Sequence, residues 1–124
     1  MDGDDHRAAV LTAGLFKAVA HPVRVLVLEV LADGERPVGE LADRLGIELS
    51  HLSQQLAVLR RAGVVSTRRV GSVVFYRLRD PRATQLLFVA RQLLVASLRD
   101  TREVLQRLDD EAQGAGHPKG AGHR

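Results

Sequence analysis

The segment from Ser50 to Gln55 carries side chains that can hydrogen-bond to the edges of DNA bases. A glutamine amide can bond adenine through N6 and N7, whereas serine hydroxyls and imidazoles are less selective. The leucines between these residues recur at helical spacing, which would leave the polar groups together on the outer side of a helix. The candidate base-reading residues are Ser50, His51, Ser53, Gln54 and Gln55.

Arginines follow this segment and could bind the phosphates of the same nucleic acid. Residues 49–79 hold six arginines and no Asp or Glu, whereas the rest of the chain has 12 Lys+Arg against 15 Asp+Glu. Such a concentration of positive charge indicates a nucleic-acid-binding surface, although a solvated basic face explains charge alone equally well. The candidate contacts are Arg60, Arg61, Arg68, Arg69 and Ser72.

Two of these assignments, and one further arginine, have simpler alternatives. Arg60 and Arg61 would lie in the last turn of their helix, where they could instead complement its dipole. Arg24, near the start of an earlier predicted helix, could contact a phosphate or form a salt bridge. The side chains alone leave these alternatives open.

The sequence gives little support for thiol chemistry, enzymatic catalysis or the binding of single strands. There is no cysteine, which excludes disulfides, thiolate metal sites and cysteine nucleophiles. G-x-S-x-G, H-E-x-x-H and a glycine-rich phosphate loop are also missing, so we expect neither enzymatic activity nor a cofactor. Aromatic residues make up only 3% of the chain, which argues against single-strand binding by base stacking.

The histidines form no close helical pair. His21 and His51 fall within predicted structure, whereas His6, His117 and His123 lie near the ends of the chain. The three terminal imidazoles could join in a metal site across a dimer. Solvated terminal histidines are the simpler interpretation.

The elements that must position these residues follow from the apolar periodicity. Helices are predicted from about Arg7 to Ala20 and over the segments PVRVLVLEVLADG, RPVGELADRLG and SHLSQQLAVLRRAG. The alternating residues Val64–Val70 and Val73–Leu78, separated by Gly71-Ser72, predict a β-hairpin. A last helix is predicted from Asp80-Pro81 to about Asp110. We therefore predict a mainly α (α+β) winged helix-turn-helix with five helices and a two-stranded wing, in the order α-α-α-α-β-β-α.

The predicted last helix is apolar over more than one face between residues 86 and 98. A helix with one face in solvent would not carry so broad an apolar stripe. We therefore expect the last helix to pack on a second subunit as well as on its own domain. The predicted interface consists of Leu11, Leu15, Phe16, Leu87, Ala90, Leu94, Leu98 and Leu105. A two-fold dimer would set its two base-reading helices about 34 Å apart, one turn of DNA.

The expected organisation is one domain with two polar ends. We expect a flexible N-terminus over 1–6, a DNA-binding and dimerisation domain over 7–111, and a disordered Gly/His tail over 112–124. The apolar runs are too short to cross a bilayer, and the acidic N-terminus lacks a signal-peptide core. A cytoplasmic, nucleoid-associated protein is expected.

The segments AHPVRVLVLEVL, VGELADRLGI and SHLSQQLAVLRRAGVVSTRRVGSVVFYRL resemble the ArsR/SmtB family of bacterial winged-helix repressors. The resemblance runs from about Leu15 to Leu78, and its phrase S-x-L-S-Q-Q-L-x-V-L-R-x-A-G-V-V is highly specific. It implies a homodimer built on the first and last helices, with the helix from Ser50 in the major groove. It also implies repression of a promoter that a ligand relieves.

The metal sites known in this family mostly fail to carry over. The position of the family's C-V-C thiolate site is occupied by Pro37-Val38-Gly39. In the site on the last helix, Asp80 matches the family's Asp, but the other three ligand positions hold Arg82, Leu93 and Ala96. One ligand in four cannot hold a transition metal.

The sequence thus predicts a dimeric, sequence-specific regulator of transcription that represses its target and lacks the family's metal and thiol sites. Its partners would be double-stranded DNA with a two-fold operator, a second copy of the chain, and an unidentified small-molecule effector if one exists. One alternative is a nickel, cobalt or zinc sensor that uses terminal histidines. Another is a protein-interaction module, against which Arg68 and Arg69 argue because a neutral wing would be its mark.

Overall fold

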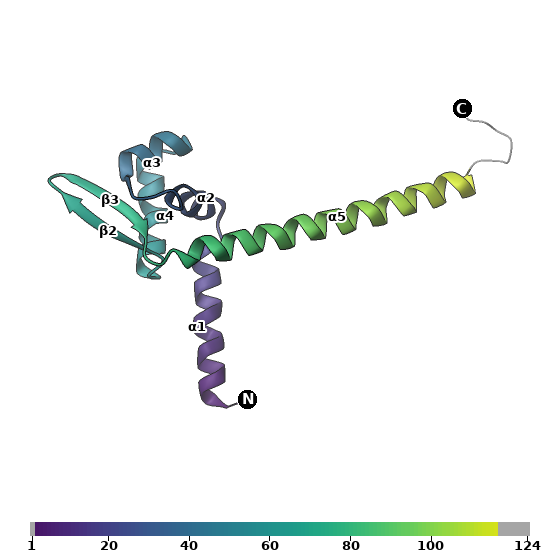
Figure 1. The fold of residues 1–124 in the computed structure, drawn as a ribbon, viewed down its shortest axis with the longest axis horizontal. Helices are drawn as coiled ribbons and strands as arrows, with labels where there is room; N and C mark the ends of the chain where they lie inside the picture. Colours follow the sequence, from purple (N-terminus) through teal and green to yellow (C-terminus); the bar gives the residue numbers. More distant parts are fainter. Residues whose placement is uncertain (1, 117–124) are drawn as a thin grey trace. The chain divides into compact units, whose positions relative to one another are not determined.

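A computed structural model describes residues 2–116 of the 124-residue chain (Figure 1). The described helices and strands are α1 (Gly3–Val19), α2 (Pro22–Leu31), β1 (Arg36–Pro37), α3 (Val38–Leu45), α4 (Leu49–Arg61), β2 (Val65–Val70), β3 (Val73–Leu78) and α5 (Arg82–Gly116). The chain divides into two compact units between Leu87 and Phe88. The first unit contains the predicted helix-turn-helix and hairpin, and the described part of the second is the remainder of α5.

Local signals in the sequence explain where the helices of the first unit begin and end. His21 caps α2 because its Nδ1 accepts a hydrogen bond from the Val23 backbone N–H, and Pro22 takes the first helical position. Gly46 ends α3 in the left-handed conformation, with φ 65°, which a glycine adopts without steric cost. These caps fix the corner between α1 and α2 and the turn between α3 and α4.

The hydrophobic core lies between α2, α3, α4 and the residues Val64 and Val65 at the start of β2. Leu52, Leu56 and Leu59 are fully buried, which confirms the inward stripe predicted for this helix. The remaining buried residues that pack with them are Val27, Leu28, Leu31, Leu41, Ala42, Val64 and Val65. With its apolar stripe fixed in the core, α4 presents most of its polar side chains on its outer side.

The sheet has one strand more than the predicted two-stranded wing. The predicted hairpin is present as β2 and β3, and Val70 pairs with Val73 across the turn at Gly71-Ser72. In addition, β1 pairs with β3 in antiparallel register, Arg36 opposite Tyr76, so the strand order is β1-β3-β2. A two-residue strand has no periodicity of its own, and only its distant partner defines it.

Both terminal helices are longer than predicted. α1 begins at Gly3 instead of about Arg7, because Asp2 and Asp5 form a reciprocal capping box. α5 continues to Gly116, beyond the end predicted near Asp110, so residues 112–116 of the expected disordered tail are helical. His117 and His123 lie outside the described residues.

No single helix among the described residues is long and apolar enough to cross a membrane. The pair α1 and α2 passes that test only when taken together, and the two helices are bent by 89° at the break between them.

Candidate nucleic-acid interface

The helix-turn-helix consists of α3, the turn through Gly46 and α4, the helix that we call the reading helix. Its exposed side chains include Ser50, Ser53 and Gln54. Glu48 is the N-cap residue, and the hydroxyl of Ser50 in the first turn donates a hydrogen bond of 3.0 Å to the Glu48 carboxylate. Ser53 and Gln54 form no hydrogen bond within the described residues, so both side chains are free to bond a ligand.

Two further residues predicted to read bases contact the protein itself. The Gln55 side chain is half-buried, and its Oε1 accepts a 2.9 Å hydrogen bond from Arg24 Nε. The His51 ring meets the edge of His21 with 6.4 Å between ring centroids. His51 and Gln55 are one helical turn apart, so this face of the reading helix lies against the corner between α1 and α2. The Arg24 side chain therefore has a partner within the protein. The sequence alone left open whether it would contact a phosphate or form a salt bridge.

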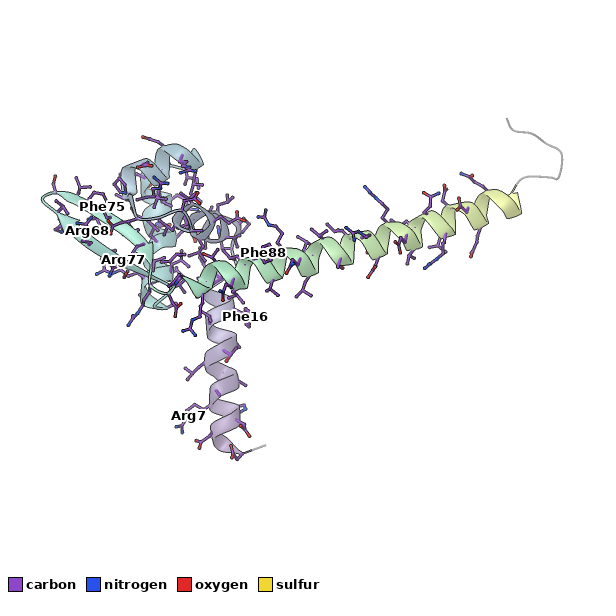
Figure 2. All side chains as sticks on the ribbon, viewed as in Figure 1. Arg7, Phe16, Arg68, Phe75, Arg77 and Phe88 are labelled. Carbon is purple, nitrogen blue, oxygen red and sulfur yellow. The ribbon has the colours of Figure 1, made fainter. Side chains whose placement is uncertain are left out.

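The wing, formed by β2 and β3, presents its two adjacent arginines differently. Neighbouring residues in a strand point to opposite faces, so Arg68 and Arg69 cannot share one. Arg68 lies over the Phe75 ring, 4.9 Å from its centroid, and Figure 2 shows the two side chains on the hairpin. The Arg68 guanidinium also donates two hydrogen bonds, of 2.6 and 3.1 Å, to the carboxylate of Glu35.

The ion pair between Arg68 and Glu35 affects the protonation of both groups. The hydrogen bond from Arg68 holds the pKa of the Glu35 carboxyl below its usual value, and the same bond raises the pKa of Arg68. A glutamate is charged at neutral pH in any case, and the lowered pKa keeps Glu35 a counter-ion for Arg68 at more acidic pH as well. A phosphate that approached this face of the wing would compete with a carboxylate already in place.

The cations without a partner lie on other parts of this surface. Within residues 2–116, Arg69, Arg60 and Arg61 form no hydrogen bond or ion pair through their side chains, and all three are exposed. A surface hollow lies between the reading helix and β3, lined by Ser53, Ala57, Arg60, Arg61 and Tyr76. Two guanidinium groups beside two hydroxyls match the chemistry of a phosphate group. The sequence did not predict that Tyr76 lines this hollow, because the pattern of a hairpin does not show which helix lies beside it. Ser72 is exposed in the turn of the wing.

Within residues 2–116, the side chains that resemble metal ligands are not arranged as a metal site. Arg82 holds Asp80 through its guanidinium, at 2.7 Å, and through its backbone N–H, and these bonds lower the pKa of Asp80 to about 2. Among the described residues, no three His, Cys, Asp or Glu side chains gather closely enough to bind a metal ion. His6 is exposed near the start of α1.

The predicted dimer residues leave a large apolar surface exposed in the single chain. Seven of the eight are exposed, namely Leu11, Leu15, Phe16, Ala90, Leu94, Leu98 and Leu105. Leu87 is half-buried because it packs on the core of the first unit. Exposed apolar surface of this extent on α1 and on α5 is typical of a face that another protein covers.

A helix-turn-helix whose second helix is polar outside, followed directly by a β-hairpin with arginines, defines a winged helix. Comparison with solved structures agrees. The crystal structure of Rv0081 from Mycobacterium tuberculosis matches with a TM-score of 0.70 and 47% identity, over 76% of this chain and 95% of that chain. The homodimeric winged helix-turn-helix DNA-binding domain Mb0332 of Mycobacterium bovis matches with a TM-score of 0.71 and 27% identity, over 81% and 93%.

The sequence comparisons identify the family. The family model described as "Bacterial regulatory protein, arsR family" matches residues 21–67. The HTH-type transcriptional regulator Rv0081 is 48% identical over 79% of this chain and 87% of its own length. The biofilm growth-associated repressor of Xylella fastidiosa is 45% identical over 68% and 74%. The chain belongs to the ArsR family of bacterial winged helix-turn-helix transcriptional regulators, as its sequence motifs predicted.

Proposed function

We propose that this regulator binds a two-fold symmetric operator in double-stranded DNA as a homodimer and represses transcription from it. The observation that carries the proposal is that exposed groups of both kinds on the reading helix and the wing have no partner within residues 2–116. Ser53 and Gln54 on the reading helix offer hydrogen bonds, and Arg60 on the same helix and Arg69 on the wing supply positive charge. Hydrogen-bonding groups that read bases, flanked by cations that hold phosphates, are the two parts of a DNA interface.

The apolar residues of α1 and α5 support the homodimer. A second copy carries the same residues and would cover them with the same kind of surface, as an isologous two-fold interface requires. The relatives that are named as repressors support the sign of regulation. A protein that represses transcription from such an operator would act in the cytoplasm, at the nucleoid.

The signal that would relieve repression is proposed to be neither a thiol oxidation nor a metal at the family's usual sites. The chain has no cysteine, and Asp80 is already paired with Arg82. A small molecule, or control through the abundance of the protein itself, remains consistent with these residues.

Binding to DNA upstream of the protein's own gene tests the proposal. Fluorescence anisotropy at several salt concentrations would give the affinity for this duplex and for a shuffled duplex of equal length. Three to five phosphate contacts per subunit predict a slope of log K against log salt of roughly −5 to −9. An affinity that changed neither with the salt concentration nor with the sequence of the duplex would overturn the proposal.

Two substitutions should separate base reading from phosphate binding. Gln54→Ala should reduce the preference for the operator over shuffled DNA by about 1–3 kcal/mol per subunit, because it removes one base contact in each half-site. Arg69→Ala should weaken binding to both duplexes alike and make the salt slope shallower by about 1 per subunit. Titrations of both variants on both duplexes would measure this.

Matched controls for these substitutions lie away from the proposed interface. Gln85→Ala and Arg7→Ala remove the same side chains from exposed positions on α5 and α1. Both controls should bind like the unmodified protein. If Gln54→Ala and Arg69→Ala lost affinity in the same pattern, the division of roles would be wrong.

The ion pair on the wing yields a separate prediction. Glu35→Gln should release Arg68 to the phosphates, because an uncharged amide competes less well than the carboxylate for the guanidinium. We expect tighter binding to any duplex and a salt slope steeper by about 0.9 for each arginine released. The control is Glu40→Gln, which removes the carboxylate of another surface ion pair, with Arg36 at 3.2 Å. Weaker binding by Glu35→Gln would instead mean that the ion pair holds the wing in its binding position.

A further inference from the structure

We propose that Arg24 is a positioning residue that sets which base Gln55 accepts. Because Arg24 holds the amide oxygen, the NH2 group of Gln55 is the part left to bond a base. The inference rests on the proposed function, because it assigns to Arg24 a role in base selection that Arg24 exerts through Gln55 and not by contacting a base.

The geometry determines the orientation of the amide. Arg24 Nε donates to Gln55 Oε1 at 2.9 Å, and a guanidinium has donors only, so the atom facing it must be the oxygen. The same guanidinium is fixed from its other side. Its Nη1 donates to the carbonyl oxygens of Ala18, at 3.0 Å, and Lys17, at 3.4 Å, in the last turn of α1.

The half-buried position of both side chains makes this arrangement persistent. Arg24 lies at the start of α2, whose N-terminus is fixed by the cap at His21, and His21 in turn contacts His51 of the reading helix. The planar guanidinium spans α1 and the reading helix with two of its nitrogens at once. A lysine ammonium at this position would keep the charge but not this fork of donors.

The chemical consequence concerns adenine. A bidentate contact to adenine needs the amide oxygen to accept from N6 while the NH2 group donates to N7. With its oxygen turned to Arg24, Gln55 offers mainly a donor. A donor suits guanine, which presents acceptors at O6 and N7, or thymine, which presents O4. Adenine also presents an acceptor at N7, but its N6 amino group then meets no acceptor on Gln55, whereas guanine presents two acceptors to the NH2 group. The clamped Gln55 should therefore favour guanine over adenine at its position in each half-site.

Selection from a pool of random duplexes, followed by sequencing, would test this with the full-length protein. The Gln55→Ala variant would identify the position in the half-site that depends on Gln55. At that position the unmodified protein should disfavour adenine, and Arg24→Lys should raise the share of adenine by about five-fold or more, the effect of about 1 kcal/mol. Preferences at other positions should stay unchanged. Arg7→Lys, an exposed arginine on α1, is the control.

Two results of that selection would overturn the proposal. One is an Arg24→Lys variant that binds every sequence more weakly with unchanged preferences, which would make Arg24 a phosphate contact. The other is an Arg24→Lys variant whose affinity and base preferences are the same as those of the unmodified protein. If the unmodified protein showed no sequence preference at all, the proposed function would fail as well, so the two failures are distinguishable.

A measurement without DNA keeps the proposal testable if Arg24→Lys does not fold. In nitrogen-15 NMR spectra, the Arg24 Nε–H should exchange slowly with water, and Gln55→Ala should shift its signal and speed its exchange. The Nε–H signals of exposed arginines such as Arg7 should not change. An Arg24 Nε–H that exchanged fast in both proteins would overturn the clamp.

Discussion

Replacing Leu98 with glutamate should separate the dimer into monomers and weaken binding to the operator by about 100-fold or more. Leu98 is 59% exposed in the single chain, and Leu94, one turn earlier on α5, is 58% exposed. A carboxylate buried in an apolar interface without a partner is costly enough to prevent association. Loss of the second subunit removes the avidity of two linked half-sites, which is worth a factor of about 10²–10⁴.

Sedimentation equilibrium would measure the state of association of this variant, and anisotropy its affinity for the operator. Arg107→Glu is the control, because it introduces the same carboxylate on the side of α5 opposite to Leu98 by helical periodicity. This control should remain dimeric. A dimeric Leu98→Glu protein with normal operator affinity would show that α5 does not form the interface.

A second large effect is expected in the core. Leu56→Ala should lower the free energy of unfolding by about 2–5 kcal/mol, because Leu56 is fully buried and the truncation leaves a cavity. That is a substantial share of the roughly 5–15 kcal/mol by which natural domains are stable. The reading helix depends on this side chain for its position, so operator affinity should decline together with stability.

Urea denaturation followed by circular dichroism would give the free energy of unfolding, at one protein concentration because the proposed dimerisation would contribute to stability. Leu49→Ala is the control on the same helix, since Leu49 is half-exposed and should cost much less. Equal losses from the two substitutions would contradict the assignment of Leu56 to the core.

The parts of the fold that the sequence predicted are those that local patterns define. The spacing of Leu52, Leu56 and Leu59 is that of one helical face, and all three are buried. The turn at Gly71-Ser72 marks the hairpin, and Gly46 marks the end of α3 with its positive φ. Each of these signals lies within a few residues of the feature that it predicts.

The parts that the sequence did not predict depend on residues far apart in the chain. β1 exists only through its pairing with β3, and Glu35 meets Arg68 only because that pairing brings the two segments together. The contact of Arg24 with Gln55 likewise joins two helices. The early start of α1 differs, because its capping box at Asp2 and Asp5 could have been recognised from spacing alone.

The sequence therefore predicted the region of the candidate interface, and the structure distinguishes its free side chains from those that already have partners. The free side chains of Gln54, Arg60 and Arg69 lie where the pattern predicted exposed groups. Arg68 and Gln55 were predicted for the same role, but both already have partners in the protein. Charge and polarity identify a surface, whereas the partners of each side chain determine which of its groups can reach a ligand.

We propose that two copies of this chain present paired reading helices to adjacent turns of the major groove. Selection of binding sites from random duplexes tests it most directly, because the recovered sequences record the symmetry and spacing of the protein. The claim predicts an inverted repeat whose half-sites are centred about 10–10.5 base pairs apart. Recovery of no enriched sequence, or of a single half-site without its symmetric mate, would contradict it.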